Sequence, residues 1–396
     1  MSEIKVNSIK GVGASTAAIT VNNSDGTCSA NITSINGGSI GTKNLIINGA
    51  MQVAQRGTSG STANGYPSID RFYTFSYGLD ETPTMSQGSL TSSDTPYSSG
   101  FRKYLRFQNG NQTGGAATGD QTQFKQAIEG QDVANSGWNY TSSSSFITLS
   151  FWIRASVSQT YYGFLKATDG GNYIYPFSMA LTADTWTKVT KSIAGNSNLQ
   201  IDDDTGNGLE FGIYPFLGTS YTDNSVSLDT WAAYSSGTTR TPDHTTTWYT
   251  TNDSTIDITG VQLEVGSVAT DFEHRSFAQE LFLCQRYYEV LVSGSGKTWG
   301  GIASMYRANE THHQCNWVEK RATPSLEFTT GTNYYAFYGN LSNVTANRPT
   351  QLLYAHTKAG GIQTDSSYLS GNLLQGGAAF SYSNNASAFV AVSAEL

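Results

Sequence analysis

The side chains best suited to chemistry in this chain are aromatic rings in stretches rich in Gly, Asn, Ser and Thr. The electron-rich face of a Tyr or Trp ring can stack on the C–H face of a sugar, while nearby amides and carboxylates fix the hydroxyls. The candidates for such contacts are Tyr161, Tyr162, Tyr173, Tyr175, Trp231, Tyr234, Trp248 and Tyr249. Contact between subunits and plain packing are the alternative roles of the same rings. Trp152 and Trp186 are expected in the core, because they stand in alternating apolar runs.

A run of three carboxylates, Asp202, Asp203 and Asp204, precedes the turn residues at 205–208. Clustered carboxylates and carbonyls can bind Ca²⁺, which takes six to eight oxygen ligands. The run lacks the twelve-residue spacing with a terminal Glu that a calcium loop uses. We therefore expect a solvated turn, with a calcium site as the weaker alternative.

Catalytic patterns are absent from the sequence. The five His residues do not form His-Glu-x-x-His or another metal-ligand spacing. No Gly-x-Ser-x-Gly surrounds a plausible nucleophile. Glycoside cleavage would need two carboxyl groups about 5 to 10 Å apart, for which Asp70 and the Asp202–Asp204 run are nonspecific candidates. We expect no enzyme and no cofactor, and keep a polysaccharide depolymerase as a minor alternative.

The elements that must position these residues are short strands. Only 13% of residues are charged, while the chain holds 23 Tyr and 41 Gly but only 8 Pro. Tyr, Thr, Val and Phe favour strands, and Gly, Asn and Ser favour tight turns. The composition predicts a mainly β protein.

Charge, cysteine content and hydropathy narrow the partners. The net charge of −8 has no basic block beside it, so direct binding of nucleic acid is not expected. Three cysteines without a Cys-x-x-Cys pair predict neither a disulfide framework nor a zinc site. No signal-peptide core and no run of 18 apolar residues occurs, so a membrane-spanning chain is not expected.

Four regions follow one another along the chain. Residues 1–43 carry short strand-like runs that cannot bury a core alone, which predicts an anchoring or assembly segment, or one that packs on the next domain. Residues 44–275 hold at least eight strand-like runs and predict a two-sheet sandwich or jelly roll. Residues 276–290 predict a linking helix, and residues 291–396 a small β domain with oligomeric support.

The expected helix has its own signals. Ser276 is placed to cap the first turn, and Glu280 lies near the positive end of the helix dipole. Phe277, Leu281, Cys284 and Tyr288 form one apolar stripe that we expect to pack on the sandwich or on another subunit.

Four ordered motifs resemble a module of bacteriophage tail-fibre proteins. They are the opening segment 44–57, the Ile69-Asp70-Arg71-Phe72-Tyr73 run, the closing segment 259–273, and the helix with Cys284-Gln285-Arg286-Tyr287-Tyr288. Each is weak alone, but their order and spacing agree with that family over residues 44–290. The segments 5–21, 321–324 and 393–396 resemble other parts of phage fibre-like proteins, particularly those of marine phages.

The resemblance implies a carbohydrate-binding-like jelly roll, homotrimeric, on a virion tail and assembled in the host cytoplasm. Its partners would be other tail proteins, reached through residues 1–43, and a host-surface glycan or outer-membrane component. The function expected is adsorption to the host, and a purely structural tail or capsid adaptor is the alternative. Asp70, Arg71 and Arg286 recur in the family. We expect them in a buried Arg–carboxylate pair joining helix and sandwich rather than in a ligand site.

Overall fold

The computed structural model describes residues 43–234, 240–339, 342–365, 367–371 and 375–396, together with five short strands before residue 43. These strands are β1 (Ser8–Ile9), β2 (Ile19–Val21), β3 (Cys28–Ala30), β4 (Ser34–Ile35) and β5 (Gly38–Ser39). The first three form one antiparallel sheet and the last two form a hairpin. Most of the segment expected to anchor the chain therefore lies outside the described residues.

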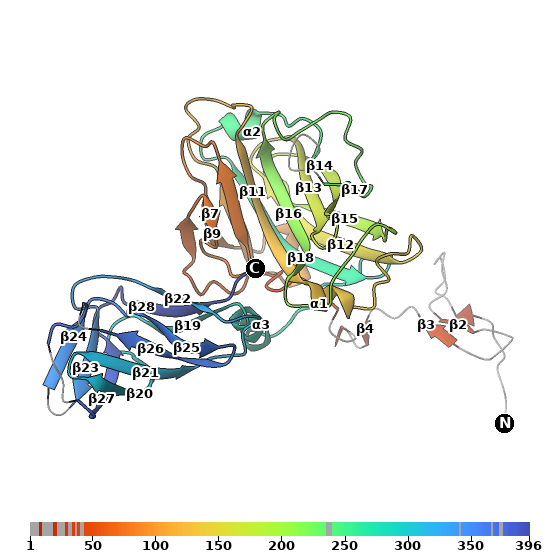
Figure 1. Ribbon diagram of the computed structural model, residues 1–396. Helices are drawn as coiled ribbons and strands as arrows, with labels where there is room; N and C mark the ends of the chain where they lie inside the picture. Colours follow the sequence, from red (N-terminus) through yellow and green to blue (C-terminus); the bar gives the residue numbers. More distant parts are fainter. Residues whose placement is uncertain are drawn as a thin grey trace, which may run out of the picture.

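Two sheets form the central domain (Figure 1). The six-stranded sheet has the order β15-β12-β18-β10-β9-β6, and the seven-stranded sheet has the order β17-β14-β13-β16-β11-β8-β7. Their strands are β6 (Ser59–Ser61), β7 (Asn64–Gly65), β8 (Tyr73–Tyr77), β9 (Thr84–Ser89), β10 (Lys103–Gln108), β11 (Gln121–Glu129), β12 (Phe146–Ala155), β13 (Gln159–Ala167), β14 (Tyr173–Leu181), β15 (Thr187–Ala194), β16 (Asn207–Leu217), β17 (Ala232–Ala233) and β18 (Thr255–Val265).

Neighbouring strands of both sheets run antiparallel. The chain changes sheets repeatedly, since β8, β11 and β16 lie in one sheet and β9, β10, β12 and β15 in the other. That alternation is typical of a jelly roll. The predicted mainly β class and the sandwich over the central region are confirmed. The trimeric state stays a prediction.

Alternating side chains of β12 and β18 form the centre of the core. Ile147, Leu149 and Ile153 of β12 are fully buried, as each inward position of a half-buried strand should be. In β18 the inward series skips one position, because Gly260 (φ 65°) forms a bulge opposite the register shift in β12. Each such aliphatic side chain contributes roughly 1.5–3 kcal/mol by burial.

The prediction that Trp152 and Trp186 lie in the core is half right, because Trp186 is buried but on the outer face of the six-stranded sheet. Trp186 belongs to a separate apolar cluster outside the inter-sheet core, with Trp152 packed against it. Trp186 donates from Nε1 to Asp94 (2.9 Å), and the guanidinium of Arg154 lies 4.7 Å from its ring. Alternation places Trp152 opposite the core positions of β12, so aromatic residues occur on both faces of this sheet.

Three short helical elements and one linking helix complete this part. They are the 3-10 helix η1 (Thr95–Ser99), α1 (Gly130–Ala134), α2 (Thr247–Thr250) and α3 (Phe277–Gln285). Ser276 caps α3 as expected: its Oγ accepts from the Gln279 backbone N–H (3.3 Å), and Gln279 Oε1 accepts from the Ser276 N–H (3.0 Å). Among the described residues, no helix has the length and hydropathy to cross a membrane.

The predicted stripe of α3 is only half right. Cys284 and Tyr288 are buried, but Phe277 is 55% exposed, and Phe282 is 61% exposed. Glu280 is the residue that turns inward instead. Its carboxylate accepts a hydrogen bond from the backbone N–H of Asn48, so a polar contact decides which face of the helix packs.

The C-terminal domain is a smaller antiparallel β assembly with its own core. A three-stranded sheet (β19-β28-β22) accompanies a seven-stranded sheet (β24-β23-β27-β20-β21-β26-β25). The strands are β19 (Tyr288–Ser293), β20 (Thr298–Arg307), β21 (Glu310–Asn316), β22 (Ser325–Phe328), β23 (Tyr335–Gly339), β24 (Ser342–Ala346), β25 (Gln351–His356), β26 (Ala359–Thr364), β27 (Ala378–Ser383) and β28 (Phe389–Ser393). Cys284 and Cys315 are buried free thiols.

Candidate functional site

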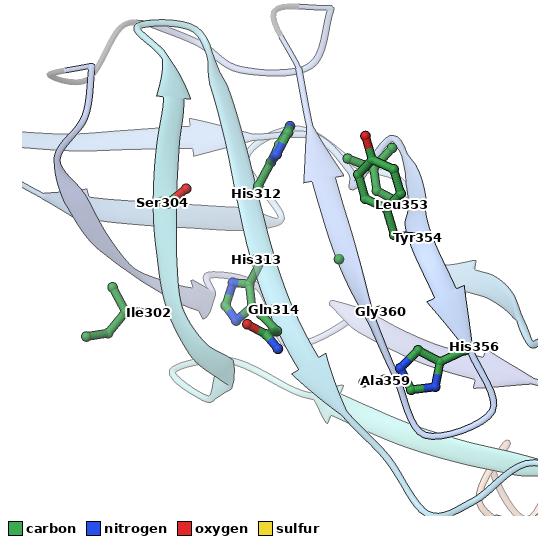
Figure 2. Close-up of a pocket in the computed structure, with 11 residues that line it drawn as sticks. Ile302, Ser304, His312, His313, Gln314, Leu353, Tyr354, His356, Ala359 and Gly360 are labelled. Atoms are coloured by element: carbon green, nitrogen blue, oxygen red, sulfur yellow. The ribbon is translucent and has the colours of Figure 1, made fainter.

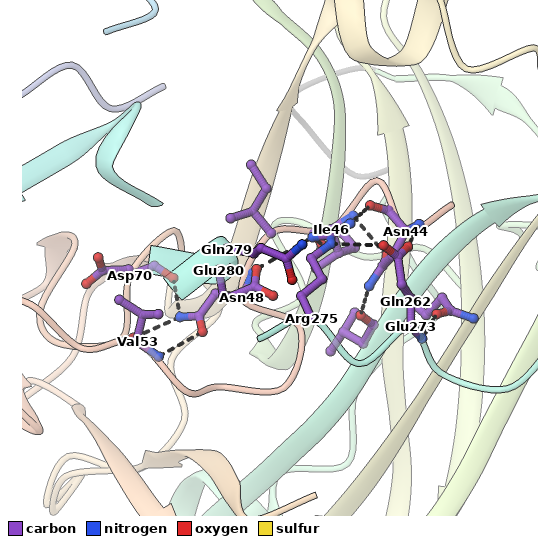
Figure 3. A network of polar contacts seen from close by, with 12 residues as sticks. Asn44, Ile46, Asn48, Val53, Asp70, Gln262, Glu273, Arg275, Gln279 and Glu280 are labelled. Carbon is purple, nitrogen blue, oxygen red and sulfur yellow. Dashed lines mark hydrogen bonds and ion pairs between the residues drawn. The ribbon is translucent and has the colours of Figure 1, made fainter. Parts of the chain in front are cut away.

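The motifs that carry the family resemblance meet in one buried polar network (Figure 3). The side chain of Asn48 donates to the carbonyl oxygens of Val53 (2.8 Å) and Asp70 (3.1 Å), and its Oδ1 accepts from the Val53 N–H (3.0 Å). The side chain of Asn44 accepts from the N–H of Leu263 (3.0 Å). Hydrogen bonds between side chains and backbone therefore connect the opening segment 44–57 to the run at 69–73 and to the closing segment 259–273.

Asp70 belongs to this network through its backbone carbonyl, whereas Arg71 and Arg286 make ion pairs of their own. Asp70 accepts from the Gln55 backbone N–H (2.8 Å) and Nε2 (2.5 Å), and burial raises the pKa of Asp70 to about 6. Arg71 is buried, pairs with the Glu395 carboxylate and donates to the Ala127 carbonyl (2.7 Å).

Arg286 lies at the C-terminal end of α3. It forms a two-pronged pair with Glu129 of β11, whose carboxylate is fully buried. Asp70 and Arg71 therefore do not pair with each other. The partner of Arg71 comes from the last residues of the chain, which end where the two domains meet (Figure 1).

Several aromatic candidates for glycan contact lie inside the protein. Tyr161, Trp248 and Tyr249 are at most 1% exposed and belong to the inter-sheet core, together with Tyr175. Trp248 stacks at 6.4 Å from Phe107, and Tyr249 at 4.2 Å from Phe216. Their expected location in turns is wrong, because β13, β14 and α2 hold these rings, and a buried ring cannot stack on a sugar.

The other candidates lie nearer the surface but do not form one group. Tyr162 is nearly buried against His244, with ring centroids 4.7 Å apart. Half-buried Trp231 donates from Nε1 to the Ala194 carbonyl (2.9 Å) and meets Tyr175 edge-on, while Tyr173 begins β14. Tyr234 alone among the eight lines a cleft on the outer face of the seven-stranded sheet.

We call this hollow the outer-face cleft. It has a volume of about 210 Å³ and combines aromatic rings with charged and amide side chains. Its lining residues are Phe75, Gln123, Lys125, Phe164, Lys166, Glu210, Tyr214, Tyr234 and Arg240.

Strand alternation explains why these residues share one face. Phe124 of β11 points into the core, so its neighbours Gln123 and Lys125 point outward. In β16 Leu209 and Phe211 point inward, which directs Glu210 outward between them.

Aromatic rings form one wall of the outer-face cleft. Phe164 and Tyr214 stack with ring centroids 4.5 Å apart and planes at 23°. Tyr234, held by a hydrogen bond from its N–H to the Asn172 carbonyl (2.9 Å), stands beside them. Lys166 Nζ lies 4.5 Å from the Tyr234 ring centroid. Phe164 and Tyr214 are only 1% and 2% exposed, so the ring that this wall presents is the half-buried Tyr234, with the Lys166 cation beside it.

Glu210 is the central acid of the cleft. It is 5% exposed, and its carboxylate receives Lys125 Nζ at 2.6 Å, Lys166 Nζ at 3.8 Å and Asn207 Nδ2 at 2.8 Å. Burial alone raises the pKa of Glu210, but the two lysines outweigh it and hold that pKa below its usual value. Burial lowers the pKa of Lys166.

Arg240 adds a third cation. Its Nη1 donates to Gln121 Oε1 (2.7 Å), and its guanidinium lies 4.7 Å from the Tyr221 ring and 5.8 Å from the Tyr234 ring. Three cationic side chains and one carboxylate therefore line the cleft, on a chain whose net charge is −8.

The sequence analysis did not identify the charged residues of the cleft, Lys125, Lys166, Glu210 and Arg240. A signal was present: Phe164 and Lys166, like Gln123 and Lys125, stand two residues apart in strand-like runs. That spacing places polar and aromatic residues on one face of a strand. It does not reveal which strands are neighbours.

The Asp202–Asp204 run does not converge on one point. Asp202 accepts from Gln200 Nε2 (3.0 Å), Asp203 from Asn135 Nδ2 (2.9 Å) and Asp204 from the Gly206 N–H (2.8 Å). Across the described ranges, no group of three or more His, Cys, Asp or Glu side chains is arranged to hold a metal ion.

Neither a protein-family model nor a curated protein sequence matches the chain. Among solved structures it is similar to one described as "CBM4 structure and function", at 14% identity over 55% of this chain and 98% of that one, with a TM-score of 0.26.

It is also similar to a putative sugar binding protein from Bacteroides thetaiotaomicron, at 10% identity over 57% of this chain and 100% of that one, with a TM-score of 0.30. A tandem CBM22 domain from Paenibacillus barcinonensis Xyn10C matches at 9% identity over 90% of this chain and 100% of that one, with a TM-score of 0.25. These are likenesses to carbohydrate-binding modules, too faint to carry an argument about function.

Proposed function

We propose that this chain is a bacteriophage tail-fibre protein whose outer-face cleft binds acidic glycans of the host surface. The observation that carries the glycan part is the meeting of the half-buried Tyr234 ring with three cations and an amide in one hollow. The virion part rests on the four ordered motifs. In this proposal residues 1–43 attach the protein to the tail, and three copies form the fibre.

The aromatic wall suits the apolar side of a sugar ring. Sugar C–H groups carry a slight positive charge and are attracted to the negative face of an aromatic ring. Tyr234 is the only half-buried ring among Phe164, Tyr214 and Tyr234, so it is the one able to cover a bound sugar. Gln123 supplies amide donor and acceptor atoms for hydroxyl groups.

The charges select an acidic sugar. The Glu210 carboxylate is paired with Lys125 and Lys166, and the Arg240 guanidinium lines the same cleft. A carboxylate-bearing or phosphorylated sugar would be attracted by these three cations. A neutral sugar would gain no ionic attraction from them, which disfavours it.

A glycan array probed with the full chain tests the binding. We expect signals on acidic oligosaccharides, and loss of about tenfold or more in affinity for Tyr234→Ala, which corresponds to about 1.4 kcal/mol or more. Tyr338→Ala, an exposed tyrosine of the other domain, is the matched control and should bind normally. Silence of the wild-type chain on acidic glycans would end the proposal.

Placement on the virion needs its own experiment. Mass spectrometry of purified particles should detect the protein, and particles made with a chain lacking residues 1–43 should lack it. Particles that still carry the truncated protein would contradict the anchoring role.

A second function, a structural adaptor between tail or capsid parts, is favoured by the exposed Phe277 and Phe282 of α3. Exposed aromatic rings on one helix suit contact between subunits. Native mass spectrometry separates the two functions when combined with the array: a stable assembly without glycan binding supports the adaptor.

A further inference from the structure

A second hollow lies on the seven-stranded sheet of the C-terminal domain (Figure 2). We call it the C-terminal groove; it has a volume of about 400 Å³ and spans β20, β21, β26 and β25. No residue of the outer-face cleft belongs to it. Its lining residues are Ile302, Ser304, His312, His313, Gln314, Leu353, Tyr354, His356, Ala359, Gly360 and Gly361.

The floor of the groove is open because β26 carries glycines there. A Cβ built on Gly361 would meet only Leu353, at 3.4 Å from its carbonyl oxygen and 3.6 Å from its Cβ. Gly361 pairs with Leu353 on one side and Gln314 on the other. The missing side chain therefore creates the hollow between two neighbouring strands.

Tyr354 forms the most unusual wall. It lies at a register shift between Leu353 and His356, has a φ of 50°, and is 95% exposed. A positive φ is costly for a bulky residue, and bulges commonly re-aim a side chain beside a functional site. The fold thus accepts local backbone strain and leaves an aromatic ring in solvent at the edge of a hollow.

The polar groups of the groove are uncharged or only conditionally charged. Among its lining residues there is no Asp, Glu, Lys or Arg. Ser304 and Gln314 are exposed, and within the described part of the chain their side chains make no hydrogen bond. His312 bonds Glu310 (2.7 Å) and stacks on Tyr306 at 4.8 Å.

We propose that the C-terminal groove is a second saccharide site, and that it takes a neutral sugar. Tyr354 and Ile302 supply apolar contact, while Ser304 and Gln314 supply the hydroxyl and amide that a sugar's hydroxyl groups require. With no Asp, Glu, Lys or Arg in its lining, the groove offers an acidic sugar no permanent cation. This site goes beyond the proposed acidic-glycan cleft and does not depend on it.

Two other occupants fit less well. Under the groove, β20, β21 and β26 are paired on both sides, and only β25 lies at an edge of the sheet, so a peptide strand could be added beside the groove but not across it. The hollow of about 400 Å³ has the size of a small-ligand pocket, roughly 300–1,000 Å³, whereas a second copy would need a contact surface of roughly 800 Å² on each partner. A small ligand is favoured over a second copy.

The test uses the full chain on an array that carries neutral and acidic oligosaccharides together. Tyr354→Gly removes the ring and also relieves the positive φ, so it should not lower the unfolding temperature. Binding to neutral glycans should nevertheless fall about tenfold or more. Gly361→Leu fills the hollow and should have the same effect by a different route.

The controls separate this site from the first. Tyr338→Ala, on β23 of the same sheet, should bind neutral glycans normally, and Tyr234→Ala should lose only acidic ones. The proposal is overturned if the wild-type chain binds no neutral glycan on the array. It is also overturned if Tyr354→Gly and Gly361→Leu both bind neutral glycans as tightly as the wild-type chain does. A third result would also overturn the proposal: the wild-type chain binds proline-rich peptides but no neutral glycan, and Tyr354→Gly loses the peptide binding. The groove would then be a peptide site.

Discussion

The guanidinium of Arg286 donates two parallel hydrogen bonds to the buried carboxylate of Glu129, from Nε to Oε1 at 2.7 Å and from Nη2 to Oε2 at 2.7 Å. This pair joins the end of α3 to β11 of the central sandwich. Arg71 performs a similar task from the other side by pairing with Glu395. Two residues of the family motifs thus hold the helix and the end of the chain against one sheet.

Removing one partner of the Arg286–Glu129 pair should be costly. Arg286→Met leaves a fully buried carboxylate without its cation, so we expect the free energy of unfolding to fall by about 3 kcal/mol or more. Denaturant titration measures this. Lys191→Met breaks the more exposed Lys191–Asp229 pair (2.8 Å) and should change stability by less than about 1 kcal/mol. Equal effects would mean that the buried pair has no special role.

The bulge at Gly260 should not tolerate a side chain. Its φ is 65°, and a Cβ there would lie 2.5 Å from Cζ of Phe101. Gly260→Ala is therefore expected to destabilise the sandwich by about 1–3 kcal/mol through strain and overpacking. Gly119→Ala, where a Cβ meets nothing within 4 Å, is the control for thermal unfolding. A Gly260→Ala chain as stable as the control would show that the bulge is adaptable.

Acid should weaken the C-terminal domain through His313. This imidazole is 1% exposed, and burial lowers its pKa to about 4 from the ordinary 6.5. The unfolded chain binds the proton first as the pH falls, so the stability from the neutral ring is complete above about 6.5 and is lost progressively down to about 4. The full effect is about 3 kcal/mol.

The matched variant for this prediction is His313→Gln, which does not titrate. Denaturant titrations at about pH 7 and about pH 4.5 should show a smaller loss of stability for His313→Gln than for wild type. His356→Gln, at an exposed position, should keep the wild-type dependence. An unchanged pH dependence in His313→Gln would assign the acid sensitivity to other groups, among them buried His244, whose pKa burial lowers to about 3.

The central sandwich was accessible from the sequence because alternation at period two is a local signal. The runs around β12, β15 and β18 predicted strands that the structure contains. Alternation does not say which of two faces is the core, and in this protein both faces of a sheet carry aromatic rings. That is why Trp152 was expected in the core. Tyr161 was a candidate for sugar contact, with subunit contact and plain packing as alternatives, because its Gly-containing run resembles a turn rather than the strand β13.

The functional candidates were harder because they depend on which strands are neighbours. Lys125, Lys166 and Glu210 come from three strands far apart in the sequence and meet only when β13, β16 and β11 pair. Helix α3 shows the same limit: the apolar stripe favoured Phe277, but the contact of Glu280 with the Asn48 backbone selects the packed face. Polar contacts between residues that are far apart in the sequence produce no periodic pattern by which they could be predicted.

The most direct test of the central claim compares one acidic oligosaccharide with its carboxyl-reduced, neutral counterpart by titration calorimetry on the full chain. We expect the acidic form to bind at least about tenfold more tightly, and Lys166→Met to lose most of that preference while Lys191→Met keeps it. Equal affinity for the two forms, or an unchanged preference in Lys166→Met, would contradict an acidic-glycan site in the outer-face cleft.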